Sequence, residues 1–396
     1  MKSLRIVQVL TTPPLPFGSA AGRWSYAMLK GLTARGHRVT VFSPCQNAAE
    51  GAEASRIFPQ SEYALHCFEY ADRPQLQSKL TALRRPQSYI YSRELETALH
   101  RALRESYDIL HLEQQWTGWL TFPPRPRTLV GLQSLFRLDC PTSAGGSLMD
   151  RLRYRRIRDA EAALLRRFPS FCALTAEMTD EVRSIHPQAS VHTIPLGIDL
   201  ENYPFDAIST EDTQVVTMIG SFDWLPTRTA TIRLLVRLWP AIHERVPFAS
   251  LRIVGRHARK VLADYISVPG VTVEENVPDI LPYFQQAAVL LYAPERGSGM
   301  KVKVLESFAL GLPVVTTQSG VEGIPAVAGV HAGICEDDEG LIDACVSLLN
   351  DRAARLRQRT AARRLVERWC SSNVVLDALE DVYEEMLAQG RENVVA

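Results

Sequence analysis

The start of the chain alternates strand-like and helix-like segments, and this alternation restricts the fold more than any other feature. RIVQVL (5–10) is a short apolar run that ends in TTPPLPFG, which predicts a buried strand followed by a loop. From Ala20 to Arg35, large apolar residues recur every three or four positions, as in an amphipathic helix. GHRVTVFSP then predicts a second strand. A strand, helix and strand in succession favour a parallel sheet.

The same alternation continues to the end of the chain and restarts once. After the polar stretch 201–214, VVTMIG (215–220) predicts a new first strand, and a helix is expected from Ala230 to His243. The other predicted strands lie at 107–112, 128–133, 171–176, 191–196, 249–255, 270–277, 288–294, 312–317 and 331–336. Two doubly wound α/β domains would bind ligands at the carboxyl ends of their strands. We expect domains at 1–205 and 206–372, and a C-terminal helix, 373–396, that returns to the first domain.

Composition excludes several classes of protein. Lysine plus arginine and aspartate plus glutamate both number 44, and this zero net charge argues against a dedicated nucleic-acid binder. The seven cysteines form no CxxC pair, so they are expected to be buried thiols rather than disulfides or a zinc site. No apolar run approaches the roughly 20 residues of a membrane span, and the N-terminus lacks a signal-peptide pattern. The expected location is the cytoplasm.

The segment ERGSGMKVKVLESFALGLPVV (295–315) is the strongest candidate for a binding site. A helix is expected from Met300 to Leu310, with Gly311 as its C-cap. Lys301 would lie in the first turn, where the helix dipole disfavours a cation by about 0.3–1 kcal/mol. A bound phosphate would reverse that balance, because Gly297 and Gly299 allow backbone N–H groups to approach it. The alternative is an ordinary helix on which Lys303 and Glu306 form a solvated pair.

The wider sequence resembles glycosyltransferase family 4, whose members are retaining enzymes of the GT-B fold. The resemblance is strongest in GSGMKVKVLESFALGLPVVTT, in GSFDWLPT (220–227), in RIVGR (252–256) and in VTVEENVPDILPYFQQAAVLLYAP. PFGSAAGR, ARGHRVTVFSP, DILHLEQ and IPLGIDLENY (194–203) are similar to N-terminal family segments. The resemblance implies two facing Rossmann-like domains with a cleft between them.

The resemblance also implies roles in binding the donor. Glu306 matches the family glutamate that holds the ribose hydroxyls of the donor nucleotide. Ser298 stands where a second glutamate usually contacts the donor sugar, and Glu295 is a substitute three residues upstream. Ser221 stands where an arginine is common, so Lys301 and Lys303 are expected to bind the diphosphate instead. The other predicted donor-site residues are Gly220, Arg228, Arg256, Val277, Gly297, Gly299, Met300 and Val304.

On the acceptor side, Gly18 and Gly22 bracket the loop after the first strand, which the resemblance places near the donor phosphates and the acceptor. His111 and Glu113 are two apart in a predicted strand, so they share a face. Either could orient the acceptor hydroxyl or take its proton, and with Lys303 they form the predicted catalytic set. A buried structural histidine is the other interpretation of His111. Gln133 stands where relatives often carry a histidine.

A basic helix, 151–167, allows two interpretations. It is either a weak peripheral membrane or anionic-acceptor contact of the N-terminal domain, or a solvated helix with internal salt bridges. The second is favoured, because Leu152, Tyr154 and Ile157 do not form a wide apolar stripe.

These observations predict a metal-independent glycosyltransferase without a cofactor. It would transfer a sugar from a nucleotide-diphosphate sugar, with UDP favoured, to a hydroxyl of a saccharide, lipid-linked or small-molecule acceptor, with retention of configuration. The alternatives are a sugar-nucleotide 2-epimerase of the same fold and a sugar-nucleotide binding protein that has lost catalysis.

Overall fold

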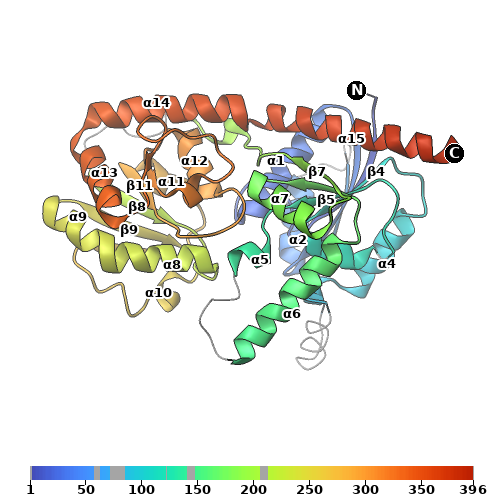
Figure 1. Cartoon of the computed structure of the whole chain (residues 1–396), viewed down its shortest axis with the longest axis horizontal. Coiled ribbons are helices and arrows are strands. Elements are labelled where there is room, and N and C mark those ends of the chain that lie inside the picture. Colours follow the sequence, from blue (N-terminus) through green and yellow to red (C-terminus); the bar gives the residue numbers. More distant parts are fainter. Residues whose placement is uncertain are drawn as a thin grey trace. The chain divides into compact units, whose positions relative to one another are not determined.

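The computed structural model describes residues 2–57, 63–71, 85–121, 123–140, 148–205 and 213–395 (Figure 1). The chain forms two compact units, Met1–Gly197 with Ser372–Ala396, and Ile198–Ser371. The sequence analysis placed the boundary after residue 205. In the structure, Arg363 donates hydrogen bonds from Nη1 to the carbonyls of Tyr203 and Ala309, at 2.8 and 2.6 Å. These bonds attach the segment before residue 205 to the second unit.

Unit 1 contains a seven-stranded parallel sheet of order β3-β2-β1-β4-β5-β6-β7. Its strands are β1 (Arg5–Val9), β2 (Arg38–Cys45), β3 (Tyr63–Glu69), β4 (Ile109–Glu113), β5 (Thr128–Leu132), β6 (Ser170–Ala173) and β7 (Ser190–Thr193). Its helices are α1 (Ala20–Ala34), α2 (Ala48–Ile57), α4 (Arg93–Ala102), α5 (Phe136–Asp139), α6 (Leu148–Leu165), α7 (Ala176–Ile185) and α15 (Ser372–Val395). Every residue of β4 and β5 is buried, because helices cover both faces of a parallel sheet.

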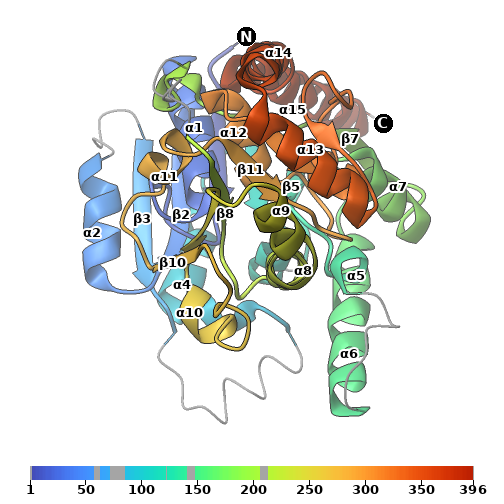
Figure 2. The ribbon, with the colours of Figure 1, turned by 90° about the vertical axis from the view of Figure 1, so that its left-hand side faces the viewer.

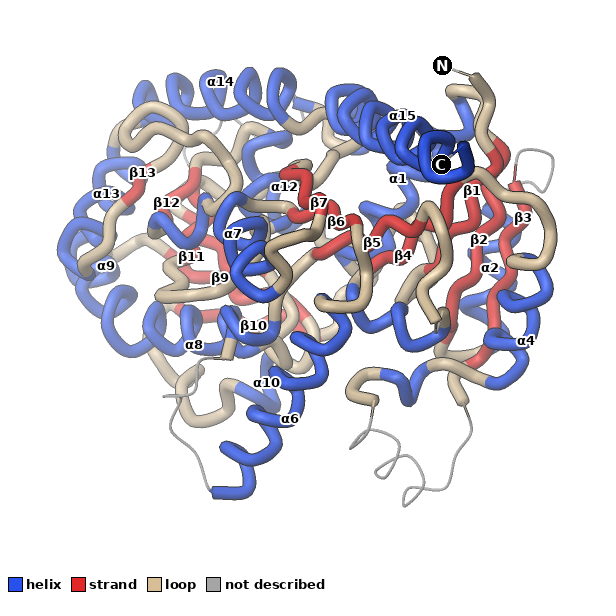
Figure 3. The backbone as a smooth tube through the Cα atoms, turned by 45° about the vertical axis from the view of Figure 1, so that its right-hand side comes forward, coloured by secondary structure: helices blue, strands red, loops and turns tan. Residues whose placement is uncertain are grey.

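Unit 2 contains a six-stranded parallel sheet of order β10-β9-β8-β11-β12-β13. Figure 3 draws the strands of both sheets in red. Its strands are β8 (Val215–Ile219), β9 (Ser250–Gly255), β10 (Val271–Glu275), β11 (Val289–Tyr292), β12 (Val314–Thr316) and β13 (Gly333–Ile334). Its helices are α8 (Leu225–Arg233), α9 (Trp239–Arg245), α10 (Ala258–Val261), α11 (Leu281–Gln285), α12 (Val302–Leu310), α13 (Asp338–Asn350) and α14 (Arg352–Trp369).

The predicted α/β class and the two parallel sheets are confirmed. The helix expected from Ala230 to His243 begins earlier, as α8, and a π-helical segment, Leu234–Leu238, separates it from α9. Pro240 lies in the first turn of α9 and has no N–H to donate, which is consistent with this irregularity. None of the described helices combines the length and apolar character required to span a bilayer.

Each sheet has one point at which the strand order reverses. In unit 1 it lies between β1 and β4, and in unit 2 between β8 and β11. Doubly wound sheets bind ligands outside the carboxyl ends of the strands at this point. The residues that follow β8 and β11 are therefore the first place to look for a site in unit 2.

Candidate functional site

Lys303 lies at the strand reversal of unit 2. Its side chain extends from the first turn of α12, and Nζ donates a hydrogen bond to Thr227 Oγ1 at 3.0 Å. Nζ is also 4.0 Å from the ring centroid of Tyr292, the last residue of β11. A Cβ atom at Gly220, directly after β8, would lie only 2.9 Å from Nζ. The ends of β8 and β11 and the start of α8 thus surround one ammonium group.

The charges around Lys303 favour the binding of an anion at its ammonium group. Burial and, to a smaller extent, the neighbouring charge of Lys301 lower the pKa of Lys303 to about 7, while Glu306 opposes the shift. The ligand-free protein therefore holds this lysine only partly charged at neutral pH. A phosphate placed beside Nζ would favour the protonated form and raise the pKa.

Lys301 has a different environment from the one predicted. Its side chain is 9% exposed, and Nζ donates to the carbonyls of Gly297 and Gly299 at 2.7 and 2.5 Å. Nζ is also 3.2 Å from Glu322 Oε2. An ammonium has three protons to donate, and these three acceptors use them. Without a ligand, Lys301 therefore holds the glycine loop, residues 297–299, in place. Its role toward a diphosphate stays a prediction.

The glycine loop precedes α12, with Lys301 as the N-cap residue rather than a member of the first turn. Gly299 has φ +76°, in the left-handed region that favours glycine. Ser298, Met300 and Val304 are buried, so their side chains belong to the packing around the loop. At the other end of the helix, Gly311 has φ +77° and is the predicted C-cap.

Glu306 lies on α12, one turn after Lys303, and only 2% of the residue is exposed. Tyr203, near the start of unit 2, donates its hydroxyl proton to Glu306 Oε1 at 2.8 Å. A carboxylate offers about four acceptor positions, so its chemistry suits hydroxyl donors. Because Glu306 is covered in the ligand-free protein, a ribose can reach it only if a neighbouring side chain moves.

Three further predicted donor residues lie toward the carboxyl ends of the strands of unit 2. Arg228 is exposed in the first turn of α8, and Arg256 is exposed directly after β9. Val277 is half-buried just beyond β10. The loops after β8 and β9 are joined, because the Phe222 N–H donates to the Arg256 carbonyl at 3.2 Å. Arg256 and Val277 therefore follow the carboxyl ends of β9 and β10, and Arg228 lies on the helix that supplies Thr227.

Sequence reasoning missed three neighbours of the predicted residues, Tyr203, Thr227 and Tyr292. Thr227 and Tyr292 lie inside segments that carried the family resemblance, but neither has a charge or an unusual spacing. Tyr203 ends the IPLGIDLENY segment, and it is 103 residues from its partner Glu306. No local sequence pattern could have related these two residues.

In unit 1, Gly18 is exposed in the loop after β1 and has φ +79°. The next residue, Ser19, caps α1 by accepting the Gly22 N–H at 3.1 Å. Gly22 lies inside α1, where a Cβ would come within 2.9 Å of the Pro13 carbonyl oxygen. Gly22 therefore allows the loop to lie closely against the helix, and Gly18 makes the turn.

His111 and Glu113 lie on one face of β4, as predicted, but within a closed polar cluster. The two residues are 3% and 2% exposed. His111 Nδ1 lies 2.7 Å from the hydroxyl of Tyr383 on α15, and Gln8 and Gln133 donate to Glu113 at 3.3 and 3.4 Å. This geometry favours the structural interpretation of His111. Its role toward an acceptor stays a prediction.

Burial also shifts the protonation of this pair. It lowers the pKa of His111 to about 4. It raises the pKa of Glu113 to about 8, against the hydrogen bonds from Gln133 and Gln8. At pH 7 the folded protein therefore holds both side chains mainly in their neutral forms, as expected for ionisable groups without solvent.

We expect Glu113 to make the folded state less stable as the pH rises from about 4.5 to about 8. In that window the folded carboxyl keeps its proton and the unfolded one has lost it. The free energy of unfolding should then fall by up to about 1.4 kcal/mol per pH unit from this group. Thermal unfolding between pH 5 and 8 measures the effect, and Glu113→Gln should remove that contribution. The exposed Glu105→Gln is the matched control, and a parallel pH profile for Glu113→Gln and wild type would contradict the assignment.

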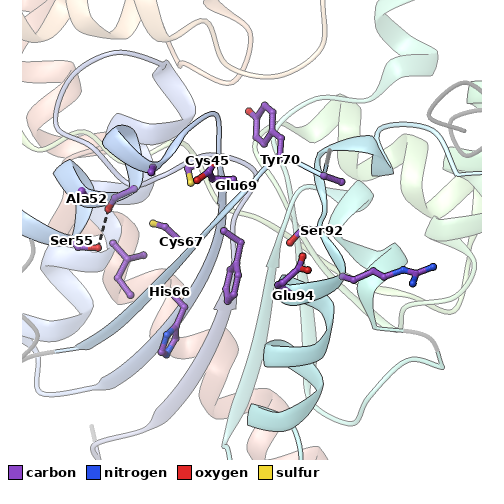
Figure 4. A pocket seen from close by; sticks show the side chains of 15 residues that line it. Cys45, Ala52, Ser55, His66, Cys67, Glu69, Tyr70, Ser92 and Glu94 are labelled. Carbon is purple, nitrogen blue, oxygen red and sulfur yellow. Dashed lines mark hydrogen bonds between the residues drawn. The ribbon is translucent and has the colours of Figure 1, made fainter. Parts of the chain in front are cut away.

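A cleft of about 1110 Å³ opens beside the edge strand β3 of unit 1 (Figure 4). It lies between α2 and the N-terminal end of α4. Figure 2 shows α2 beside β3. Carboxylates of Glu69 and Glu94, the hydroxyls of Ser55 and Ser92 and the phenol of Tyr70 line it. Carboxylates, hydroxyls and a phenol suit a ligand rich in hydroxyls, because they accept and donate hydrogen bonds.

Comparisons with known proteins agree with this architecture. The family model for glycosyltransferase family 4 matches residues 21–202, and that for glycosyl transferases group 1 matches residues 213–351. Sucrose-phosphate synthase from Thermosynechococcus elongatus has a similar fold, with 15% identity, a TM-score of 0.71, and coverage of 98% of this chain and 100% of its own. HepE from Anabaena, solved with UDP and glucose, has 14% identity, a TM-score of 0.67, and coverage of 96% and 100%. No curated protein matches the chain significantly by sequence.

The two parallel doubly wound units and their structural neighbours show the GT-B fold. The chain belongs to the group 1 and family 4 glycosyltransferases, with one family match on each side of the segment between residues 202 and 213. The predicted fold and the predicted family are thus confirmed.

Proposed function

We propose that the protein transfers a hexose from a UDP-sugar to a hydroxyl of a saccharide, a lipid-linked glycan or a small metabolite, with retention of configuration. The observation that carries this proposal is the position of Lys303 Nζ at the strand reversal of unit 2, beside Gly220 and Thr227. Glu306 lies one turn further along the same helix. A cation and a carboxylate at this spacing suit a diphosphate and the ribose next to it.

The proposed roles follow from charge and hydrogen bonding. Lys303 stabilises the negative charge that develops on the departing diphosphate, since a preorganised cation acts most strongly in a site shielded from water. Glu306 accepts protons from the ribose hydroxyls. The acceptor hydroxyl attacks from the face that the diphosphate leaves, and the leaving phosphate takes its proton. No enzyme nucleophile is needed, and the cleft beside β3 is our candidate for the acceptor.

Thermal unfolding against a panel of nucleotide diphosphates and nucleotide sugars tests this proposal. Selective ligands raise the apparent stability by mass action, so UDP and one UDP-sugar should raise the unfolding temperature most. Incubation of the stabilising donor with candidate acceptors then measures transfer and slow hydrolysis. No stabilisation by any nucleotide diphosphate would reject the proposal. Binding without hydrolysis or transfer would favour the inactive binding protein.

Tyr203 is expected to orient Glu306 toward the ribose. Tyr203→Phe keeps the ring but removes the hydroxyl that donates to Oε1. A neutral donor of this kind contributes about 0.5–1.5 kcal/mol, so the affinity for UDP should fall by roughly two- to tenfold. The ratio of affinities for UDP and 2′-deoxy-UDP should fall as well. An unchanged ratio at unchanged fold would show that Tyr203 only packs against α12.

A further inference from the structure

Helix α6 of unit 1 is held most firmly at its C-terminal end. Glu161 is fully buried, and its carboxylate accepts the N–H groups of Phe136 and Arg137 at 2.8 and 3.1 Å and the amide of Gln115 at 2.7 Å. The N-terminal half has no comparable buried cluster, and Figures 1 and 2 show it extending beyond the strands of its unit.

Large apolar side chains are exposed on the N-terminal half of α6. Leu148 is 75% exposed, Met149 76% and Leu152 53%. At 3.6 residues per turn, these three side chains fall within a sector of about 100°. Tyr154 points elsewhere, since its ring packs edge-on against Phe136 at 5.8 Å between centroids. The apolar sector therefore faces away from the body, and the sequence analysis missed it by grouping Leu152 with Tyr154.

Arginines border this sector. Arg151 and Arg155 lie on one side of it, Arg153 on the other, and Arg156 within it, and all four are exposed. Asp159 lies 3.9 Å from Arg155. An apolar stripe with basic flanks is the arrangement by which interfacial helices lie in the headgroup region of a bilayer.

We propose that the N-terminal half of α6, with Leu148, Met149 and Leu152 as its apolar sector and Arg151, Arg153, Arg155 and Arg156 as its basic flank, docks on an anionic lipid surface. The apolar side chains enter the boundary between headgroups and acyl chains, and the arginines bind lipid phosphates. Anionic lipid is favoured over a soluble polyanion because Leu148, Met149 and Leu152 are each more than half exposed and form a sector beside the arginines. This proposal does not depend on the donor site.

Flotation with vesicles tests the proposal on the full chain. Wild type should bind vesicles of phosphatidylcholine mixed with phosphatidylglycerol, bind phosphatidylcholine alone much less, and lose binding as salt rises. Two variants test the two parts of the surface. One combines Leu148→Ser, Met149→Ser and Leu152→Ser in the apolar sector. The other places glutamine at all four flanking arginines. Each should lower the partition coefficient by more than about tenfold.

The matched control removes the same charge elsewhere. Glutamine at Arg352, Arg357, Arg364 and Arg368, four exposed arginines of α14, should leave vesicle binding unchanged. All replaced side chains are exposed, and thermal unfolding checks that each variant folds. Absence of wild-type binding, equal binding to both vesicle types, or equal loss in the α14 control would overturn the proposal. Full binding by the triple serine variant would also overturn it, because charge alone would then explain the contact.

Discussion

Glu306→Ala is expected to weaken UDP binding by about 10- to 100-fold, the effect of losing a charge-assisted hydrogen bond of about 1.5–3 kcal/mol. If Glu306 holds the ribose, the variant should also lose its preference for UDP over 2′-deoxy-UDP. Calorimetric titration of both nucleotides measures the two effects together. The second is the more informative, because general damage to the fold would weaken both ligands equally.

Two further variants support this experiment. Glu306→Gln keeps the shape of the side chain and can still accept the Tyr203 hydroxyl, so it separates loss of charge from loss of packing. Glu339→Ala changes an exposed glutamate at the start of α13 and should bind UDP like wild type. Unchanged UDP affinity in a folded Glu306→Ala protein would remove the central element of the proposed donor site.

Lys303→Met is expected to weaken UDP far more than UMP, because Nζ is proposed to contact the diphosphate. We expect a loss of about 10- to 100-fold for UDP. The pH dependence gives a second readout. The pKa of Lys303 in the free protein is about 7, so above that pH binding must draw a proton to the lysine. The affinity of wild type for UDP should then fall with rising pH, by up to about tenfold per unit, until the pKa of the complex is reached.

Calorimetry in buffers of different ionisation enthalpy measures this proton uptake directly. We expect nearly one proton at pH 8 for wild type, and none from this group in Lys303→Met. Lys260→Met, at an exposed lysine of α10, is the matched control and should retain both the affinity and the proton uptake. Equal losses for UDP and UMP would mean that Lys303 does not contact the second phosphate.

Local patterns in the sequence predicted the parallel sheets and the C-cap at Gly311, because these depend on residues close together in the chain. The strand β3 was missed, since YALHCFE alternates poorly and includes a charged end. The contacts of Lys301 could not be predicted, because its partner Glu322 lies 21 residues further on. The surroundings of His111 were beyond reach, since Tyr383 is 272 residues away. Charge at a helix start indicates a site, but the contacts of each lysine depend on residues that only the fold brings together.

The last helix completes the first unit, and this has a consequence for biosynthesis. Tyr383 of α15 is fully buried against His111, Glu380 lies 2.7 Å from His37 Nε2, and Leu376 fills the space above Gly31. On the ribosome, residues 198–371 emerge before these contacts can form. The second unit can therefore finish folding first, while the N-terminal unit still lacks the helix that completes its core. Loss of a few C-terminal turns would thus damage the half of the protein that is made first.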